Sequence, residues 1–167
     1  MQGSLNMSGK TTISRDSTPL TCGDAVAAIL VLDDGRYLLQ HRDDIPGIWY
    51  PDHWGCFGGA IDPGEEPQET MSRELREELA IELQPTGPIL KMDYEIVGRG
   101  KFYRNYFVSE ISHEQVSAIQ LGEGQNFGLF AGSEVLEILR MTPYDAFAHY
   151  LHMSEQRITV APPTYER

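Results

Sequence analysis

Hydrophobic runs separated by polar turns predict a series of short strands along the chain. The run AVAAILVL (25–32) is typical of a buried strand, because it is continuous and ends at the turn-forming DDG. Residues 36–42 follow as its hairpin partner, and a loop rich in Pro, Gly, Asp and aromatic residues occupies 43–55. Further strands are expected near 56–59, 89–97, 101–111 and 125–130.

A period of four residues predicts a helix over 67–80. Met71, Leu75 and Leu79 recur at this spacing and therefore share one face, which we expect to be buried. Pro67 suits the first helical position, where no backbone N–H is needed for the helix ladder. The segment is thus an amphipathic helix with one face in the core.

Two more helices are expected at 133–140 and 142–152, and Thr142, followed by proline, suits the cap of the second. Strands, one helix, more strands and then helices are typical of an α/β fold, with a mixed β-sheet between helices. The chain then divides into a flexible N-terminal tail, one domain and a C-terminal tail, at residues 1–19, 20–155 and 156–167.

Composition supports a single folded domain and narrows the class of partner. The chain has 167 residues, about the length of one domain, and 41% of them are hydrophobic, which is enough for a core. The net charge of -12 argues against nucleic acid or an anionic membrane as the main partner. No apolar run reaches the length that a membrane span needs.

Neither the cysteines nor the histidines follow a metal-ligand spacing. Cys22 and Cys56 form no paired framework, and we interpret them as reduced thiols of a cytoplasmic protein. The histidines are expected to be structural or surface residues; they are His41, His53, His113, His149 and His152.

Carboxylates crowd the segment between Asp62 and Glu82. On a helix, Glu74, Glu77 and Glu78 fall within one arc of about 100°, and Glu78 borders the apolar face. Like charges at this spacing oppose the helix by about 0.2–0.5 kcal/mol per pair. A hard divalent cation such as Mg²⁺ removes that penalty and bridges to phosphates. The alternative is a solvated acidic helix face.

The residues around this helix also indicate a functional site. Gly58 and Gly59 end a strand and allow the backbone to approach another group closely. Arg73 lies on the same helix and is placed to pair with Glu65, which would tie the preceding loop to the helix.

Residues 59–81 resemble the signature of the Nudix hydrolases, G-x5-E-x7-R-E-U-x-E-E-x-G-U, where U is aliphatic. The positions that match are Gly59, Glu65, Arg73, Glu74, Leu75, Glu77, Glu78 and Ile81. Ala80 departs from the signature, since the family has a glycine there that helps to end the helix. If the backbone has a positive φ, alanine costs about 1 kcal/mol at this position. The resemblance implies the family's α/β/α sandwich, with a mixed sheet between helices.

The resemblance also implies roles for the matching residues. The carbonyl of Gly59 and the carboxylates of Glu74 and Glu78 correspond to ligands of a divalent metal, Mg²⁺ or alternatively Mn²⁺. Glu77 corresponds to a position that binds metal or activates water, depending on the member. Glu65 and Arg73 correspond to a pair that braces the loop and the helix.

Three residues outside the signature are candidates for the same site. Glu123, in LGEGQNF, resembles a distant-loop glutamate that binds metal or acts as general base, with flanking glycines that would let the loop move; a plain turn is the alternative. Arg42 is a candidate for a substrate phosphate, or else a surface charge. Trp49, with Tyr50 and Trp54 nearby, either stacks on a base or packs its loop.

The resemblance implies Mg²⁺-dependent hydrolysis of a pyrophosphate bond, in a nucleoside triphosphate or nucleotide-sugar, by attack of water on phosphorus. One alternative is a GDP-mannose-type glycosyl hydrolase that attacks the sugar carbon. Another is a non-catalytic sensor that binds a nucleotide. The expected partner is a nucleotide-type small molecule, and the chain is a monomer or a homodimer that pairs through 89–111.

Overall fold

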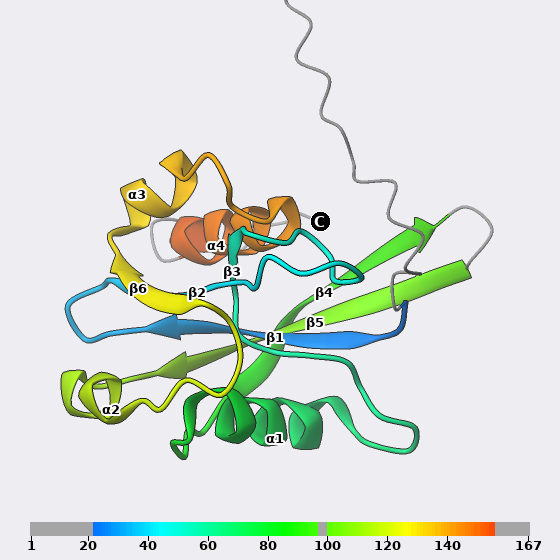
Figure 1. Ribbon diagram of the computed structural model, residues 1–167, viewed down its shortest axis with the longest axis horizontal. Coiled ribbons are helices and arrows are strands. Elements are labelled where there is room, and N and C mark those ends of the chain that lie inside the picture. Colours follow the sequence, from blue (N-terminus) through cyan, green and yellow to red (C-terminus); the bar gives the residue numbers. More distant parts are fainter. Residues whose placement is uncertain (1–21, 97–99, 156–167) are drawn as a thin grey trace, which may run out of the picture.

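The computed structural model describes residues 22–96 and 100–155, which form a mixed sheet of six strands between helices (Figure 1). The strands are β1 (Ala25–Val31), β2 (Tyr37–His41), β3 (Trp54–Gly55), β4 (Thr86–Ile96), β5 (Gly100–Glu110) and β6 (Asn126–Phe130). The helices are α1 (Pro67–Leu79), α2 (His113–Ala118), α3 (Gly132–Glu137) and α4 (Pro143–Glu155). This is the predicted α/β sandwich. The expected tails, 1–19 and 156–167, lie outside the described residues.

Strand β1 is at the centre of the sheet, whose order is β3-β2-β1-β5-β4, with β6 paired to β2. It runs antiparallel to β2 and parallel to β5, whereas β4 and β5 form a long antiparallel pair. α1 and α2 lie on one side of the sheet, and α3 and α4 lie on the other (Figure 1).

The alternation of β1 divides the core into two layers. Val26, Ala28 and Leu30 belong to the cluster that contains the apolar face of α1, whereas Ala27 and Ile29 pack in the cluster that includes α4. Because both faces of the strand are covered, its sequence is a continuous apolar run and not an alternating one. This confirms the prediction of a buried strand.

Helix α1 has the predicted buried face and an unusual end. Met71, Leu75 and Leu79 are all buried, and Pro67 is the first helical residue, as expected. The helix ends at Ala80, whose backbone is left-handed, with φ 55° and ψ 28°. The positive φ considered for this position is therefore present, and an alanine occupies a conformation that favours glycine.

Several element boundaries differ from the predictions. The strand expected near 56–59 is instead the two-residue β3, while Phe57 and Ala60 only form isolated bridges with β1. β4 begins before residue 89, and α3 is shorter than the helix expected at 133–140. Helix α2 was not predicted, because six residues are too few to show a helical period. Its start is nevertheless marked by Ser112, whose side chain accepts a hydrogen bond from the Gln115 N–H.

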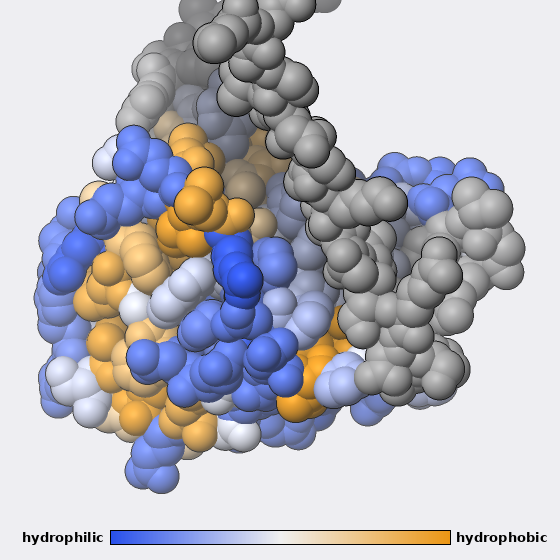
Figure 2. Space-filling view, turned by 45° about the horizontal axis from the view of Figure 1, so that its top comes forward, coloured by the Kyte–Doolittle hydropathy of each residue, from blue (hydrophilic) through white to orange (hydrophobic). Residues whose placement is uncertain are grey.

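The outer surface over α3 and α4 is mixed in character. Hydrophobic side chains interrupt the hydrophilic surface on the face shown in Figure 2. Leu136 of α3 and Phe147 of α4 are exposed, as is Leu139 between these helices. None of the helices in the described part of the chain has the length and apolar character needed to cross a membrane.

A buried ion pair ties α4 to the sheet. The Asp145 carboxylate lies 3.3 Å from Arg104 Nη2 and accepts hydrogen bonds from the Tyr106 hydroxyl at 2.8 Å, the Thr142 hydroxyl at 2.6 Å and the Cys56 N–H at 2.9 Å. Burial alone would raise the pKa of Asp145, but Arg104 and these hydrogen bonds outweigh it, so the pKa is lowered. Thr142 directly precedes α4, and its carbonyl accepts the Ala146 N–H, as an N-cap residue does.

The left-handed backbone at Ala80 leads to a first prediction. We expect Ala80→Gly to raise the free energy of unfolding by about 1 kcal/mol, because glycine has no Cβ to strain at this φ. Urea denaturation measures the change. The matched control is Ala118→Gly at the exposed end of α2, which should lower stability slightly. Equal effects of the two substitutions would contradict strain at Ala80.

The buried ion pair leads to a second prediction. Asp145→Asn should lower the free energy of unfolding by about 3–5 kcal/mol at neutral pH, because Arg104 stays buried without its counter-charge. Since the folded-state pKa of Asp145 is lowered, its contribution exists above the unfolded pKa and is lost as pH falls through the folded value. The difference between the two proteins in urea denaturation should therefore shrink in acid.

The control for this variant is Asp93→Asn, which removes an exposed ion pair with Lys101. Exposed pairs contribute little, so this substitution should change stability far less than Asp145→Asn. A difference between wild type and Asp145→Asn that grows in acid would contradict the assignment of an ionised Asp145.

Candidate active site

A cleft of about 600 Å³ opens where β1 begins and β2 ends. Its wall combines parts of α1, β4, β5, α4 and the loops after β2, before α1 and before β6. The predicted site residues that line it are Arg42, Trp49, Gly59, Glu74, Glu78 and Glu123. The other predicted site residues, Glu65, Arg73 and Glu77, lie outside this lining. The structure thus brings together residues from distant parts of the sequence.

Glu78 is the most enclosed carboxylate of the cleft, with 3% of the residue exposed. Its Oε2 accepts the Gly58 N–H at 2.7 Å, and its Oε1 accepts a hydrogen bond from the Gln40 side-chain amide at 3.0 Å. Burial raises its pKa to about 8, against the effect of these hydrogen bonds, and the negative charges of Glu123 and Glu74 raise it further. A nearby cation would favour the ionised form of this side chain.

Glu74 lies against the backbone of Gly59. A Cβ built on Gly59 would be 2.5 Å from the Glu74 carboxylate, so only glycine fits this position while the carboxylate keeps its place. Burial raises the pKa of Glu74, while the neighbouring Arg73 lowers it. The Gly59 carbonyl accepts the Val26 N–H at 2.9 Å and, as a carbonyl has two lone pairs, can accept a second partner.

Arg73 joins the loop before α1 to the helix, as the sequence predicted. Its Nε and Nη2 each bond one oxygen of Glu65, both at 2.9 Å, and its Nη1 reaches Glu74 at 2.8 Å and Glu77 at 3.1 Å. Hydrogen bonding from Arg73 lowers the pKa of Glu65 to about 2, helped by the Thr70 hydroxyl. One guanidinium therefore orients three carboxylates, of which Glu77 is exposed.

The loop that carries Glu123 is anchored at several points. The Gly122 N–H donates to the Glu78 carbonyl at 2.8 Å, and the Gly124 N–H donates to the Asp43 carboxylate at 3.2 Å. A Cβ on Gly122 would be 2.2 Å from the Glu77 carbonyl. The glycines therefore allow close packing against α1 and β2, and the mobility expected of the loop stays a prediction. Glu123 itself is exposed.

Arg42 and Trp49 lie together in the loop wall of the cleft. Arg42 Nε donates to the Trp49 carbonyl at 3.0 Å. Tyr50 also lines the cleft, but Trp54 does not. The Trp54 ring stacks on the His41 ring, with centroids 4.7 Å apart, and meets the Phe130 ring edge to face. For Trp54, packing of the loop, the alternative reading, is therefore the correct one.

The wall nearest α4 was not predicted as part of a site. It contains Arg104 and Met92 from neighbouring strands, together with Tyr94 and Tyr144. The sequence carries one signal for it, namely an arginine within the aromatic run KFYRNYF of a strand. A charged residue in such a run has to be paired or to face a cavity.

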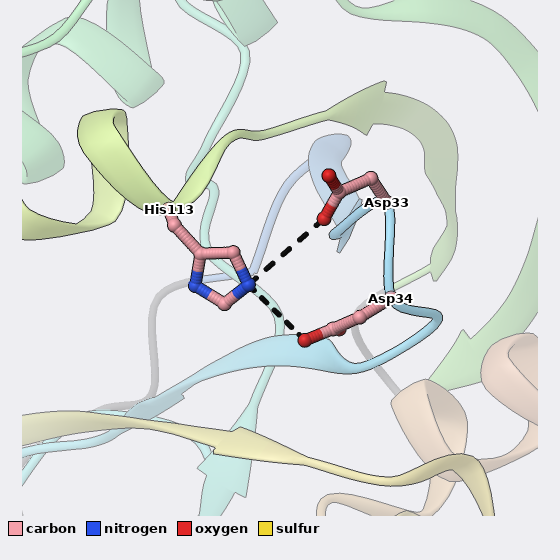
Figure 3. Close-up of side chains that lie close together, drawn as sticks. All are labelled: Asp33, Asp34 and His113. Atoms are coloured by element: carbon pink, nitrogen blue, oxygen red, sulfur yellow. Dashed lines mark hydrogen bonds and ion pairs between the residues drawn. The ribbon is translucent and has the colours of Figure 1, made fainter.

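The donor set at the α1 end fits a hard divalent cation, which prefers carboxylate and carbonyl oxygens. In residues 22–96 and 100–155, however, only Asp33, Asp34 and His113 have potential ligand atoms all within 4.8 Å of one another. Figure 3 shows this exposed group, in which His113 Nε2 lies 3.1 Å from Asp34 and 3.9 Å from Asp33. These contacts join α2 to the turn between β1 and β2.

Part of the chain is similar in sequence to a known protein. The chain is 43% identical over 54 residues to the nucleoside triphosphatase NudI of Escherichia coli (strain K12/DH10B), an alignment that covers 32% of this chain and 38% of NudI. The chain thus spans less than two fifths of the length of the curated relatives it matches.

Solved structures resemble almost the whole domain at low sequence identity. The MutT protein from Methanosarcina mazei Go1 has a TM-score of 0.70 at 20% identity, covering 84% of this chain and 98% of that protein. The dihydroneopterin triphosphate pyrophosphohydrolase of E. coli has a TM-score of 0.67 at 17% identity, covering 82% and 99%. The NUDIX domain of Shewanella oneidensis NrtR, solved with ADP ribose, has a TM-score of 0.60 at 18% identity, covering 88% and 95%.

These structures share the fold of this chain, in which the signature residues 59–81 form the loop and helix beside the cleft. The sequence matches the family model of the NUDIX domain over residues 23–161, which is most of the chain. The chain therefore belongs to the NUDIX domain family.

Proposed function

We propose that this protein hydrolyses a pyrophosphate bond in a nucleoside diphosphate linked to another group, with water attacking phosphorus and with the help of a divalent metal. The observation that carries the proposal is the position of Glu74, Glu78 and Glu123 in one cleft, with Glu78 buried. Proteins rarely bury a carboxylate without a compensating charge, and the negative charges of Glu123 and Glu74 add to the cost of ionising Glu78. NUDIX hydrolases generally use divalent metal ions.

The residues have distinct parts in this proposal. Glu74, Glu78, Glu123 and the Gly59 carbonyl would hold Mg²⁺, or Mn²⁺ in its place. When bound, the metal would supply positive charge to the phosphoryl oxygens and lower the pKa of a coordinated water. Arg73 would keep Glu74 in position through the contact at 2.8 Å.

The substrate contacts of Arg42 and Trp49 would come from the same cleft, whereas Glu77 lies outside its lining. The Nη nitrogens of Arg42 would donate to phosphate oxygens, since Nε is already held by the Trp49 carbonyl. Glu77 is exposed and orientated by Arg73, and would accept a proton from the attacking water. The Trp49 side chain would stack on the substrate. Glu65 acts through Arg73 and is a positioning residue.

The names of the similar proteins favour a triphosphate substrate. Both the nucleoside triphosphatase NudI and the dihydroneopterin triphosphate pyrophosphohydrolase act on compounds of this class, as their names state. The alternatives are attack at a sugar carbon and nucleotide binding without turnover. The full set of carboxylates in the signature at residues 59–81 favours neither alternative, and the identity of the products separates the reactions.

Three further expectations extend the proposal. Cys56 is a buried thiol, which suits a reducing, cytoplasmic compartment. β4 is the terminal strand of the sheet, so a homodimer that pairs through it is an alternative to a monomer. We propose a nucleotide-type small molecule as the partner. The net charge of -12 argues against nucleic acid as a partner, because its phosphate backbone is also negative.

The variant Glu78→Gln tests the proposal. We expect Mg²⁺-dependent hydrolysis to fall by about 100-fold or more, because the buried ligand loses its negative charge while its shape is kept. The substrates would be nucleoside triphosphates, dinucleoside polyphosphates and nucleotide-sugars, each with Mg²⁺ or EDTA. The control is Glu82→Gln, an exposed carboxylate paired with Arg76 outside the cleft, which should keep full activity.

Hydrolysis in water labelled with ¹⁸O identifies the atom attacked. We expect the label in a phosphate product; label in a released sugar would instead establish the glycosyl hydrolase. Unchanged turnover of Glu78→Gln would refute its assignment as a metal ligand. Nucleotide binding without turnover of any substrate would establish the sensor.

A further inference from the structure

The cleft has a second end that differs chemically from the carboxylate end. Arg104 pairs in register with Ala25 of β1 and with Met92 of β4, and all three line the cleft. Paired residues of neighbouring strands point to the same face of a sheet, here the face whose core includes Met92 and α4. Tyr94 and Tyr144 complete this end. The carboxylates of α1 reach the same cleft from the opposite side of the sheet.

The guanidinium of Arg104 is held from two sides and keeps one nitrogen for a ligand. Its Nη2 lies 3.3 Å from Asp145, and its Nε donates to the Tyr106 hydroxyl at 3.2 Å. The guanidinium lies over the ring of Tyr144, 4.9 Å from the centroid. Among the described residues, no hydrogen bond uses Arg104 Nη1, although the side chain is only 11% exposed and lines the cleft.

The charge of Arg104 is already compensated. Asp145 is fully buried and makes its ion pair with Arg104, so the pair as a whole is neutral. A second anionic group would gain little here, whereas an uncharged acceptor can still take the remaining N–H groups. An uncharged acceptor, such as a carbonyl oxygen, therefore fits this end.

The surroundings of Arg104 suit a flat ring. Tyr144 meets Tyr50 edge to face at 5.5 Å, and both side chains line the cleft. Met92 adds a polarisable, adaptable side chain from β4. Aromatic and thioether surfaces of this kind bind planar heterocycles through stacking and edge contacts.

We propose that this end binds the nucleobase of the substrate and that Arg104 Nη1 donates to an exocyclic carbonyl oxygen of the ring. The site then favours hypoxanthine, guanine or uracil over adenine, which has an amino group and no carbonyl. The inference rests on the proposed function, since it places the phosphates at the carboxylates of α1. In the same orientation adenine places an amino donor where the carbonyl oxygen would be, so the Arg104 donor is left without an acceptor, which disfavours its binding.

Inosine and adenosine test the base contact directly, because they differ only in the carbonyl or amino group at carbon 6 and in the proton that accompanies the carbonyl at ring nitrogen 1. Titration followed by NMR chemical shifts, in EDTA, detects millimolar binding and needs neither metal nor turnover. We expect inosine to bind about 10-fold more tightly than adenosine, the effect of one hydrogen bond to a charged donor. Equal binding, tighter binding of adenosine, or no binding of either nucleoside would overturn the inference.

Substitution of Arg104 assigns the preference to this residue. Arg104→Lys keeps a positive charge beside Asp145 but loses the planar fork, and should reduce the preference for inosine to about 2-fold or less. If this variant unfolds, Arg104→Met combined with Asp145→Leu replaces the pair by apolar groups and keeps the core filled. Arg76→Lys, an exposed arginine outside the cleft, is the control. A preference that persists in the folded Arg104 variant would overturn the assignment.

Hydrolysis of ITP and ATP with Mg²⁺ is measured in parallel and reports separately on the proposed function. A preference for inosine without hydrolysis of any nucleotide contradicts the hydrolase and leaves the base contact supported. Hydrolysis with equal kcat/KM for ITP and ATP contradicts the base contact and leaves the hydrolase supported.

Discussion

The arrangement of the cleft depends on the burial of one carboxylate, that of Glu78. A carboxylate removed from water needs partners for its oxygens, and Glu78 obtains them from Gly58 before α1 and from Gln40 on β2. Gln40 also donates to the Glu123 carbonyl at 3.2 Å, and the Glu78 carbonyl accepts the Gly122 N–H. One helical residue thus determines how four segments of the chain meet.

The two ends of the cleft carry opposite charges that need compensation. At the α1 end, negative charges gather, and only Arg73 and neutral donors compensate them within the described residues. At the α4 end, a positive charge is buried and Asp145 neutralises it locally. A ligand that carries a metal-bound phosphate at one end and an uncharged ring at the other matches both. The overall charge of -12 conceals this division.

Local patterns predicted the parts of the structure that depend on neighbouring residues. The apolar run of β1 and the four-residue period of α1 suffice to locate two core elements, and the spacing of Glu65 and Arg73 anticipates their pairing. The α4 end of the cleft could not be predicted in this way. Arg104 and Tyr144 meet through the parallel pairing of β1 with β5 and the docking of α4, which no local period encodes.

The glycines of the Glu123 loop show a second limit of sequence reasoning. A glycine that permits motion and one that permits close packing look alike in a sequence, and the close contact of Gly122 with α1 becomes visible only in the fold. The extent of α2 and β3 is similarly hidden, because segments of six and two residues are shorter than any detectable period.

The parallel pairing of β1 with β5 has a consequence for how the chain folds. The Tyr103 N–H on β5 bonds the Asp24 side chain beside β1 across 79 residues of sequence, so the centre of the sheet closes late during synthesis. Until then the most apolar strand has only its hairpin partner β2 on one side, and its other edge is open to foreign chains. Folding should therefore be slow for a domain of this size, and the period before β5 arrives is when aggregation is most favoured.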